Sequence, residues 1–247
     1  MKIILVGYAG HMGREVVACA ERDAGSEIVA GVDPMAPAQG VCVPSFEECD
    51  AEADVVIDFS HHSLTGKLLD FAKAKKLPVV LATTGQTDEE KALIREAAKE
   101  IPIFLAANYS LGIATLTDLV KRTAALYPDA EIEIVEQHHD RKLDAPSGTA
   151  LSLFNAVKEV RPDAVANCGR SGQGKRTQDE VGIHAIRMGN IVGVHEVMIG
   201  TQNERITLKH EAFSRGVFAE GSLKAAAFLA GKAAGIYDMK DLLGGNE

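Results

Sequence analysis

The densest cluster of polar side chains lies in residues 136–150, which read EQHHDRKLDAPSGTA. Two adjacent histidines, His138 and His139, are followed closely by Lys142. An imidazole exchanges protons near neutral pH, and a lysine ammonium can neutralise a carboxylate or give up a proton. We therefore expect this segment to carry out proton transfer.

The end of the same segment is a candidate anion site. Ser147, Gly148 and Thr149 open a predicted helix over residues 149–160. The first N–H groups of a helix lack partners within the helix and lie at the positive end of its dipole, so they favour a negative charge. The natural ligand of this site would be a small carboxylate.

Two other catalytic interpretations fit the segment poorly. A metal site needs converging ligands, but His138 and His139 would face opposite ways on a strand, and no third ligand follows at helical spacing. Ser147 lies outside the G-x-S-x-G pattern of a hydrolase nucleophile. We therefore predict neither a metal site nor a serine hydrolase.

A glycine-rich turn near the N-terminus predicts a second site. Glycine at such a turn lets the backbone approach a pyrophosphate that rests on the N-terminus of the following helix. The spacing is G-x-x-G-x-x-G rather than the commoner G-x-G-x-x-G, but Asp33 follows 20 residues after the last glycine, where an acid can accept hydrogen bonds from a ribose diol. The predicted cofactor contacts in the turn are Gly7, Tyr8, Ala9, Gly10, His11, Met12 and Gly13.

Two further loops follow predicted strands, at the sheet edge where doubly wound folds bind ligands. Their small and hydroxyl side chains suit contact with a nicotinamide and its ribose, although either loop could equally be plain surface. The candidate contacts are Ala82, Thr83 and Thr84 in residues 82–85, and Ala106, Ala107, Asn108 and Tyr109 in residues 106–110. The adjacent His61 and His62 at the same edge are assigned an ordinary loop role.

The first 110 residues alternate nearly continuous apolar runs with helical spacing. Such runs are typical of parallel strands buried on both faces, covered by helices. We predict a Rossmann-like, doubly wound parallel sheet. Its strands are expected at residues 2–6, 27–32, 54–58, 78–82 and 103–106, and its helices at 12–24, 63–76 and 88–100, the last with Asp88 as N-cap.

The pattern changes after residue 110. Residues 130–136 alternate polar and apolar side chains, which indicates a strand with one polar face in an antiparallel or mixed sheet. We predict two domains, residues 1–109 and 110–247, the second an α+β domain with a mixed sheet. Its other elements are expected to be helices at 111–126, 149–160 and 216–234, strands at 182–188, 193–199 and 205–210, and a loop at 169–177.

Composition excludes several classes of protein. The chain has 247 residues, 46% of them apolar, and a formal net charge of −9, which repels nucleic acid. The apolar runs are far shorter than the roughly 18 residues of a membrane span, and the N-terminus lacks the pattern of a signal peptide. The four cysteines show no C-x-x-C pair, which suggests reduced thiols. We expect a cytoplasmic protein without a nucleic-acid or membrane partner.

Taken together, these motifs resemble those of the dihydrodipicolinate reductases, also called 4-hydroxy-tetrahydrodipicolinate reductases, of bacterial lysine and diaminopimelate biosynthesis. The run HHDRKLDAPSGTA at residues 138–150 is similar to the signature of that family almost residue for residue. The glycine turn, the two loops and Ser214-Arg215 also match, so the resemblance covers essentially the whole chain.

The resemblance implies a function. The substrate would be a cyclic imine with two carboxylates, 4-hydroxy-tetrahydrodipicolinate, reduced after loss of water by hydride from a nicotinamide to tetrahydrodipicolinate. His138 would be the general acid or base and Lys142 a second proton donor. His139, Arg215 and the backbone of Ser147, Gly148 and Thr149 would hold substrate carboxylate. The resemblance also implies a homotetramer joined through the second-domain sheets, with the last helix packing back on the first domain.

The residues after Asp33 bear on the choice of cofactor. A 2′-phosphate there would meet a carboxylate of like charge. Many members of the family that this chain resembles look as though they carry an arginine at the next position. In this chain that position is Pro34. We expect NADH to be preferred over NADPH by about tenfold, or roughly 1.4 kcal/mol, with NADPH still used.

Two other functions are compatible with a nicotinamide-binding sheet. Another nicotinamide oxidoreductase, such as a semialdehyde dehydrogenase, would need an activated thiol, but Cys168 has no base nearby in the sequence. A cofactor-sensing regulator that reads DNA would need a basic recognition helix, whereas the one cationic cluster, residues 170–176, is a glycine-rich loop. Substrate-dependent oxidation of reduced cofactor would separate these readings.

Overall fold

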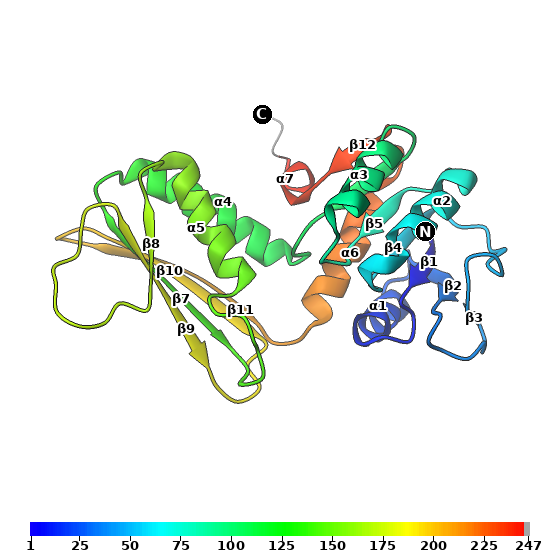
Figure 1. Ribbon diagram of the computed structural model, residues 1–247, viewed down its shortest axis with the longest axis horizontal. Coiled ribbons are helices and arrows are strands. Elements are labelled where there is room, and N and C mark those ends of the chain that lie inside the picture. The colour runs from blue at the N-terminus through cyan, green and yellow to red at the C-terminus, as the bar shows by residue number, and fades with distance from the viewer. Residues whose placement is uncertain (245–247) are drawn as a thin grey trace. The chain divides into compact units, whose positions relative to one another are not determined.

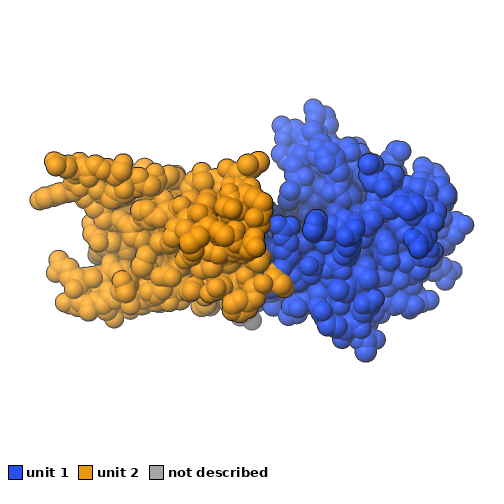
Figure 2. Space-filling view, turned by 90° about the horizontal axis from the view of Figure 1, so that it is seen from below, with its two compact units in different colours: residues 1–111, 215–247 blue, residues 112–214 orange. Residues whose placement is uncertain are grey.

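The chain divides into two compact units, coloured separately in Figure 2. The computed structural model describes residues 1–244. Unit 1 consists of residues 1–111 and of the chain from Arg215 onward, and unit 2 consists of residues 112–214. The C-terminal segment therefore belongs to unit 1 in space. The change of pattern near residue 110 placed this segment in the second domain, whereas the family resemblance implied that its last helix packs back on the first domain. No helix within residues 1–244 is long and apolar enough to cross a membrane.

Unit 1 contains a seven-stranded sheet in which every paired strand is parallel. Its strands are β-branched, apolar runs, and the central ones are buried on both faces, which confirms the predicted doubly wound sheet. In spatial order the strands are β12 (Gly235–Tyr237), β6 (Pro102–Leu105), β5 (Val79–Leu81), β4 (Val55–Asp58), β1 (Lys2–Val6), β2 (Glu27–Val32) and β3 (Cys42–Val43).

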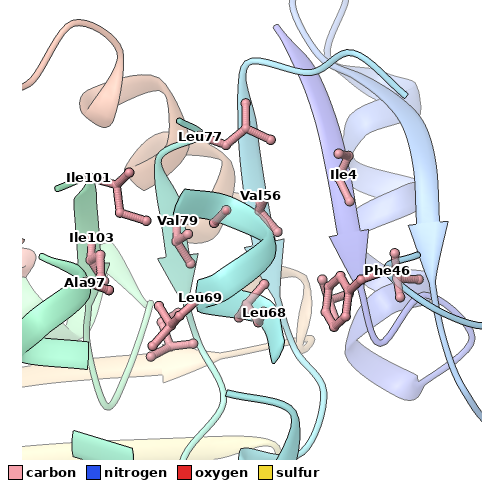
Figure 3. Close-up of a cluster of buried hydrophobic side chains, with 14 of the residues drawn as sticks. Ile4, Phe46, Val56, Leu68, Leu69, Leu77, Val79, Ala97, Ile101 and Ile103 are labelled. Carbon is pink, nitrogen blue, oxygen red and sulfur yellow. The ribbon is translucent and has the colours of Figure 1, made fainter. Parts of the chain in front are cut away.

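Helices cover this sheet. Helices α2 and α3 contact each other, and Figure 3 shows part of the apolar cluster that they form with the strands, including Leu68 and Leu69 of α2. Helices α1 and α6 pack together, and α6 contacts β4, β5 and β6. The helical elements of unit 1 are α1 (His11–Arg22), η1 (His62–Leu64), α2 (Thr65–Lys75), α3 (Asp88–Ala97), α6 (Gly216–Leu229) and α7 (Met239–Leu242).

Two predicted boundaries in unit 1 were wrong. The N-cap of α3 is Thr87 rather than Asp88, because the Thr87 hydroxyl and the Glu90 carboxylate close a capping box. The last helix ends at Leu229 rather than residue 234, and Gly231 follows with a left-handed φ of 74°. The chain then adds β12 to the edge of the sheet beside β6.

Unit 2 contains a five-stranded mixed sheet, as predicted. Strands β7, β9 and β8 are parallel to one another, whereas β10 is antiparallel to β7 and β11. Figure 1 shows the two helices of this unit lying together beside the sheet. The elements are α4 (Leu111–Leu126), β7 (Glu131–His138), α5 (Gly148–Val160), β8 (Val165–Cys168), β9 (Glu180–Arg187), β10 (Gly193–Gly200) and β11 (Arg205–Ala212).

The first residues of the polar segment belong to strand β7, and two of their side chains face the side of the sheet that packs against the helices. Ile132 and Ile134 pack in one cluster with apolar side chains of α4 and α5. The strand extends two residues beyond the predicted end at 136, so its alternation puts Glu136 and His138 on that same side, and both are buried. His138 is therefore the last residue of a buried strand, not part of the polar loop.

Candidate functional site

The glycine turn in unit 1 is built so that side chains are excluded from it. Gly7 has a left-handed φ of +80°, and a Cβ there would lie 2.5 Å from the Phe59 carbonyl oxygen. A Cβ on Gly13 would lie 2.2 Å from the Gly7 carbonyl oxygen. Gly10 is the N-cap of α1 and has no side chain to cap the helix, and the first turn contains no acid. The turn therefore fits a phosphate group on the first N–H groups of α1.

Asp33 is bound into this turn. It is only 8% exposed, its Oδ2 accepts from the Ala9 backbone N–H at 2.9 Å, and its Oδ1 accepts from the Met35 N–H at 3.0 Å. A carboxylate oxygen has two acceptor positions, so each oxygen keeps one for a ligand hydroxyl. Asp33 thus fixes the turn, a role that the sequence did not suggest, and remains able to accept from a ribose.

The two further loops are held by groups inside unit 1. Thr83 is buried, and the Asp58 carboxylate accepts hydrogen bonds from the Ser60 backbone N–H at 3.1 Å and the Ser60 hydroxyl at 2.5 Å. Burial raises the pKa of Asp58, although these hydrogen bonds oppose the rise. Thr84 and Ala107 are exposed, and Ala82, Ala106 and Asn108 are half-buried.

Tyr109 differs from its loop neighbours. Its hydroxyl donates within the fold to the carbonyl oxygens of Leu81, at 2.9 Å, and Phe104, at 3.1 Å, and the residue is 3% exposed. The side chain is therefore not available to a ligand, and a contact from Tyr109 would have to come from its backbone. In the rest of the turn, Tyr8, Ala9 and Met12 are half-buried, whereas Gly10 and His11 are exposed.

In unit 2 a fully buried carboxylate lies beside His138. Glu136 is 0% exposed, and its Oε2 accepts from His138 Nδ1 at 2.6 Å and from Arg187 Nη1 at 2.8 Å. Its Oε1 accepts from Arg187 Nη2 at 2.7 Å and from the Ser147 backbone N–H at 2.9 Å. Burial alone would raise the pKa of Glu136, but these hydrogen bonds outweigh burial and lower it.

Arg187 also connects this carboxylate to the loop that carries Lys142. Its Nη2 donates to the Asp144 carbonyl oxygen at 2.6 Å, and the Asp144 carboxylate pairs with Lys142 Nζ at 2.8 Å. Its hydrogen bonds to Glu136 raise the pKa of Arg187, and the hydrogen bond from Lys142 lowers that of Asp144. The sequence pointed to His138 and Lys142 but not to the Glu136–Arg187 pair that links their segments.

Ser147 is the N-cap of α5, and its hydroxyl contacts a second buried histidine. Its Oγ accepts from the Ala150 N–H at 3.2 Å and lies 3.1 Å from His195 Nε2. Desolvation, reinforced by the nearby His138, lowers the pKa of His195 to about 4.

The remaining predicted residues are distributed over both units. His139 and Thr149 are half-buried and Gly148 is exposed, all beside the His138 segment in sequence. Arg215 is the exposed N-cap of α6 and belongs to unit 1. Within residues 1–244, no group of three or more His, Cys, Asp or Glu residues could hold a metal ion, and the four cysteines are unpaired.

Profiles of two protein families together match nearly the whole chain. Residues 1–109 match "Dihydrodipicolinate reductase, N-terminus", and residues 112–243 match "Dihydrodipicolinate reductase, C-terminus". The chain belongs to the dihydrodipicolinate reductase family. These two matches meet near the division between the units, apart from the C-terminal segment that returns to unit 1.

Similar proteins bear the name of the same family. A 4-hydroxy-tetrahydrodipicolinate reductase of Clostridium novyi is 46% identical over 247 residues, with 98% of each chain covered. That of Clostridium tetani is 47% identical over 248 residues, covering 98% of this chain and 97% of the relative. A dipicolinate-bound dihydrodipicolinate reductase from Paenisporosarcina has the same fold, with a TM-score of 0.82, 23% identity, and coverage of 96% of this chain and 97% of that one. Family membership makes the chain an oxidoreductase that uses a nicotinamide cofactor.

Proposed function

We propose that this chain reduces 4-hydroxy-tetrahydrodipicolinate, by way of dihydrodipicolinate, to tetrahydrodipicolinate in lysine and diaminopimelate biosynthesis. The observation that carries the proposal is the pairing of His138 with the buried Glu136, joined through Arg187 to the Lys142 loop. This network sets two proton-bearing side chains beside a helix N-terminus, within a chain matched end to end by the family.

Unit 1 is proposed to hold the cofactor. The glycine turn and α1 would bind the pyrophosphate, Asp33 the ribose, and the exposed parts of the two loops the nicotinamide end. When bound, the reduced nicotinamide supplies a hydride. The role of the chain is to fix the cofactor at this sheet edge, through Gly7, Gly10 and Gly13, which leave the backbone bare.

Unit 2 is proposed to bind and protonate the substrate. The N–H groups of Gly148 and Thr149, together with His139, would bind carboxylate, because a helix N-terminus and a cation favour an anion. The ring takes up one proton as it accepts hydride, and His138 and Lys142 are the proposed sources of that proton. Proton donation of this kind typically accelerates a reaction by about 10²–10⁴-fold.

An assay with substrate generated in the reaction tests this function. The purified chain is mixed with reduced nicotinamide and freshly formed product of the preceding synthase, and cofactor absorbance is followed. We expect substrate-dependent oxidation by the wild-type chain and its loss in a folded His138→Gln variant. Equal rates with and without substrate would contradict the proposal.

We propose further that NADH is preferred over NADPH by about tenfold. Two observations support this preference. The Asp33 carboxylate is held by hydrogen bonds from the Ala9 and Met35 backbone N–H groups, and the next residue is Pro34 rather than a cation. A 2′-phosphate would be repelled by this fixed charge. We expect Pro34→Arg to move the ratio of kcat/KM values toward NADPH. A wild-type preference for NADPH would show that a cation from elsewhere reaches the ribose.

The assembly is proposed to be a cytoplasmic homotetramer joined through the unit 2 sheets. One side of β7 is covered by the helices, whereas Glu133, Val135 and Gln137 on the other side are half-buried and Glu131 is exposed. We propose that the sheet of a second copy covers this side of β7. Light scattering after size exclusion should give four times the chain mass of 26.3 kDa, and a monomer would contradict the proposal.

A further inference from the structure

The hydrogen bonds of Glu136 decide where the protons of His138 lie. Each Glu136 oxygen accepts two hydrogen bonds, from His138, Arg187 and the Ser147 backbone. An ionised carboxylate can only accept, so the His138 Nδ1 atom, 2.6 Å away, must carry a hydrogen and donate it. The other ring nitrogen, Nε2, is then the atom that can gain or lose a proton.

Space is left at that second nitrogen. A Cβ built on Gly193 of β10 would lie 3.3 Å from His138 Nε2, tighter than ordinary contact, and Gly193 has none. The His195 ring approaches the His138 ring edge-on, with centroids 5.2 Å apart and an interplanar angle of 72°. The Nε2 atom of His138 therefore faces the backbone of Gly193, which has no side chain, and its Nδ1 atom faces Glu136.

We propose that Glu136 is a positioning residue that keeps a hydrogen on His138 Nδ1 and so reserves His138 Nε2 for proton transfer to substrate. The proposal rests on the proposed acid role of His138. In the step, the Nε2–H bond of the protonated ring breaks, its electron pair stays on Nε2, and the proton bonds to the substrate. Nδ1 keeps its hydrogen, and Glu136 remains a carboxylate throughout.

Arg187 makes this arrangement possible. A carboxylate with no exposed surface would otherwise bind a proton, because burial disfavours its charge. The two guanidinium nitrogens of Arg187 donate to both oxygens in a fork, which holds the charge on Glu136. Arg187 lies opposite His138 in the β7–β9 pairing, so the sheet register itself brings the cation to the site.

The same strand offers a matched control. Glu133 accepts from His184 Nε2 at 2.8 Å and from Arg176, which repeats the same three residue types around one carboxylate. Glu133 is an odd number of residues from Glu136 on β7, so its side chain lies on the other side of the sheet. Glu133→Gln removes a comparable charge from the strand without touching His138.

The test compares Glu136→Gln, Glu136→Asp and Glu133→Gln by kinetics and by ¹⁵N NMR of His138. We expect Glu136→Gln to lower kcat by at least about 10²-fold with KM changed much less, because a wrong tautomer harms the chemical step rather than binding. The His138 signals should change from a fixed Nδ1–H form to a mixture of tautomers. Glu136→Asp, which keeps the charge, should recover part of kcat, and Glu133→Gln should keep the Nδ1–H form of His138.

The outcomes separate this inference from the proposed function. If a folded Glu136→Gln keeps wild-type kcat, or keeps the Nδ1–H signals of His138, the positioning role is wrong. If Glu136→Gln does not fold, the ¹⁵N spectrum of the wild-type chain decides, and a neutral His138 ring that carries its hydrogen on Nε2 would overturn the inference. Failure of the proposed function would appear instead as equal rates with and without substrate in the wild-type chain, with the His138 tautomer still dependent on Glu136.

Discussion

At the scale of single residues, Lys142 is held by its loop rather than by a buried network. Its ammonium contacts the half-exposed carboxylate of Asp144 at 2.8 Å, and its backbone N–H donates to the His139 carbonyl oxygen. Loss of Lys142 should therefore leave the fold intact. We expect Lys142→Ala to lower kcat/KM by about 10²-fold or more without a change in melting temperature.

A control for this substitution lies in the same unit. Lys121→Ala removes a surface ammonium that pairs with Glu159, and it should leave kcat/KM unchanged. Steady-state kinetics and thermal melts of both variants provide the comparison. Wild-type kcat/KM in folded Lys142→Ala would remove Lys142 from the reaction.

The sequence pointed to His138, His139 and Lys142 as candidates, because their residue types are unusual together. Glu136 carried a weaker signal: a charged residue in the apolar phase of an alternating strand, after Ile132 and Ile134. Arg187 carried none, since it is 51 residues from Glu136 and is brought there by the β7–β9 pairing. Long-range pairing between strands does not follow from a local pattern.

At the scale of elements, the turn before α1 sets the sharpest steric demand. A Cβ on Gly13 would lie 2.2 Å from the Gly7 carbonyl oxygen and 2.5 Å from that of Tyr8, and both are backbone atoms that cannot swing aside. Gly13→Ala should weaken NADH binding at least about tenfold and destabilise the fold by a few kcal/mol, within the range of overpacked cores.

Gly66→Ala in α2 is the control for Gly13→Ala, because it adds the same methyl group where there is room for it. Its Cβ would meet only Leu93 Cδ1 at 3.7 Å, an ordinary contact, and alanine in a helix is favoured over glycine by up to about 1 kcal/mol. We expect this variant to bind NADH as wild type does and to be no less stable. Calorimetric titration with NADH and urea unfolding measure both effects, and equal behaviour of the two variants would refute the steric argument.

The pattern of apolar residues predicted most elements of both sheets, because buried parallel strands and a half-buried alternating strand have distinct signatures. It missed β8, β12 and β3, which have four, three and two residues, since elements this short carry no period. The end of β7 was missed because Gln137 and His138 are polar and look like loop residues, although Met188 N–H still bonds to the His138 carbonyl oxygen.

At the scale of the whole molecule, His195 makes stability depend on pH. Its folded pKa of about 4 lies below the ordinary 6.5, so as the pH falls below 6.5 the unfolded chain binds a proton that the folded chain does not. Stability is therefore lost between about pH 6.5 and pH 4, by up to roughly 3 kcal/mol. The groups that influence this ring are His138, Glu136, His210 and Lys142.

Substitution of His195 measures how much of this acid loss of stability comes from its ring. The lowered pKa of Glu136 acts in the same direction, so both chains should lose stability in acid. We expect the fall in the free energy of unfolding from pH 7 to pH 4.5 to be about 2 kcal/mol smaller in His195→Gln than in wild type. Urea unfolding at the two pH values measures it, and parallel falls in both chains would show that His195 is protonated in the folded state.

Transfer of hydride from the cofactor to the substrate is the central claim, and isotope tracing tests it most directly. The wild-type chain is given NADH deuterated at the transferred position together with freshly formed substrate, and the tetrahydrodipicolinate product is analysed by mass spectrometry. We predict product that carries one deuterium, formed by the wild-type chain and not by a folded His138→Gln variant. Cofactor oxidation without deuterium in the product would contradict the account.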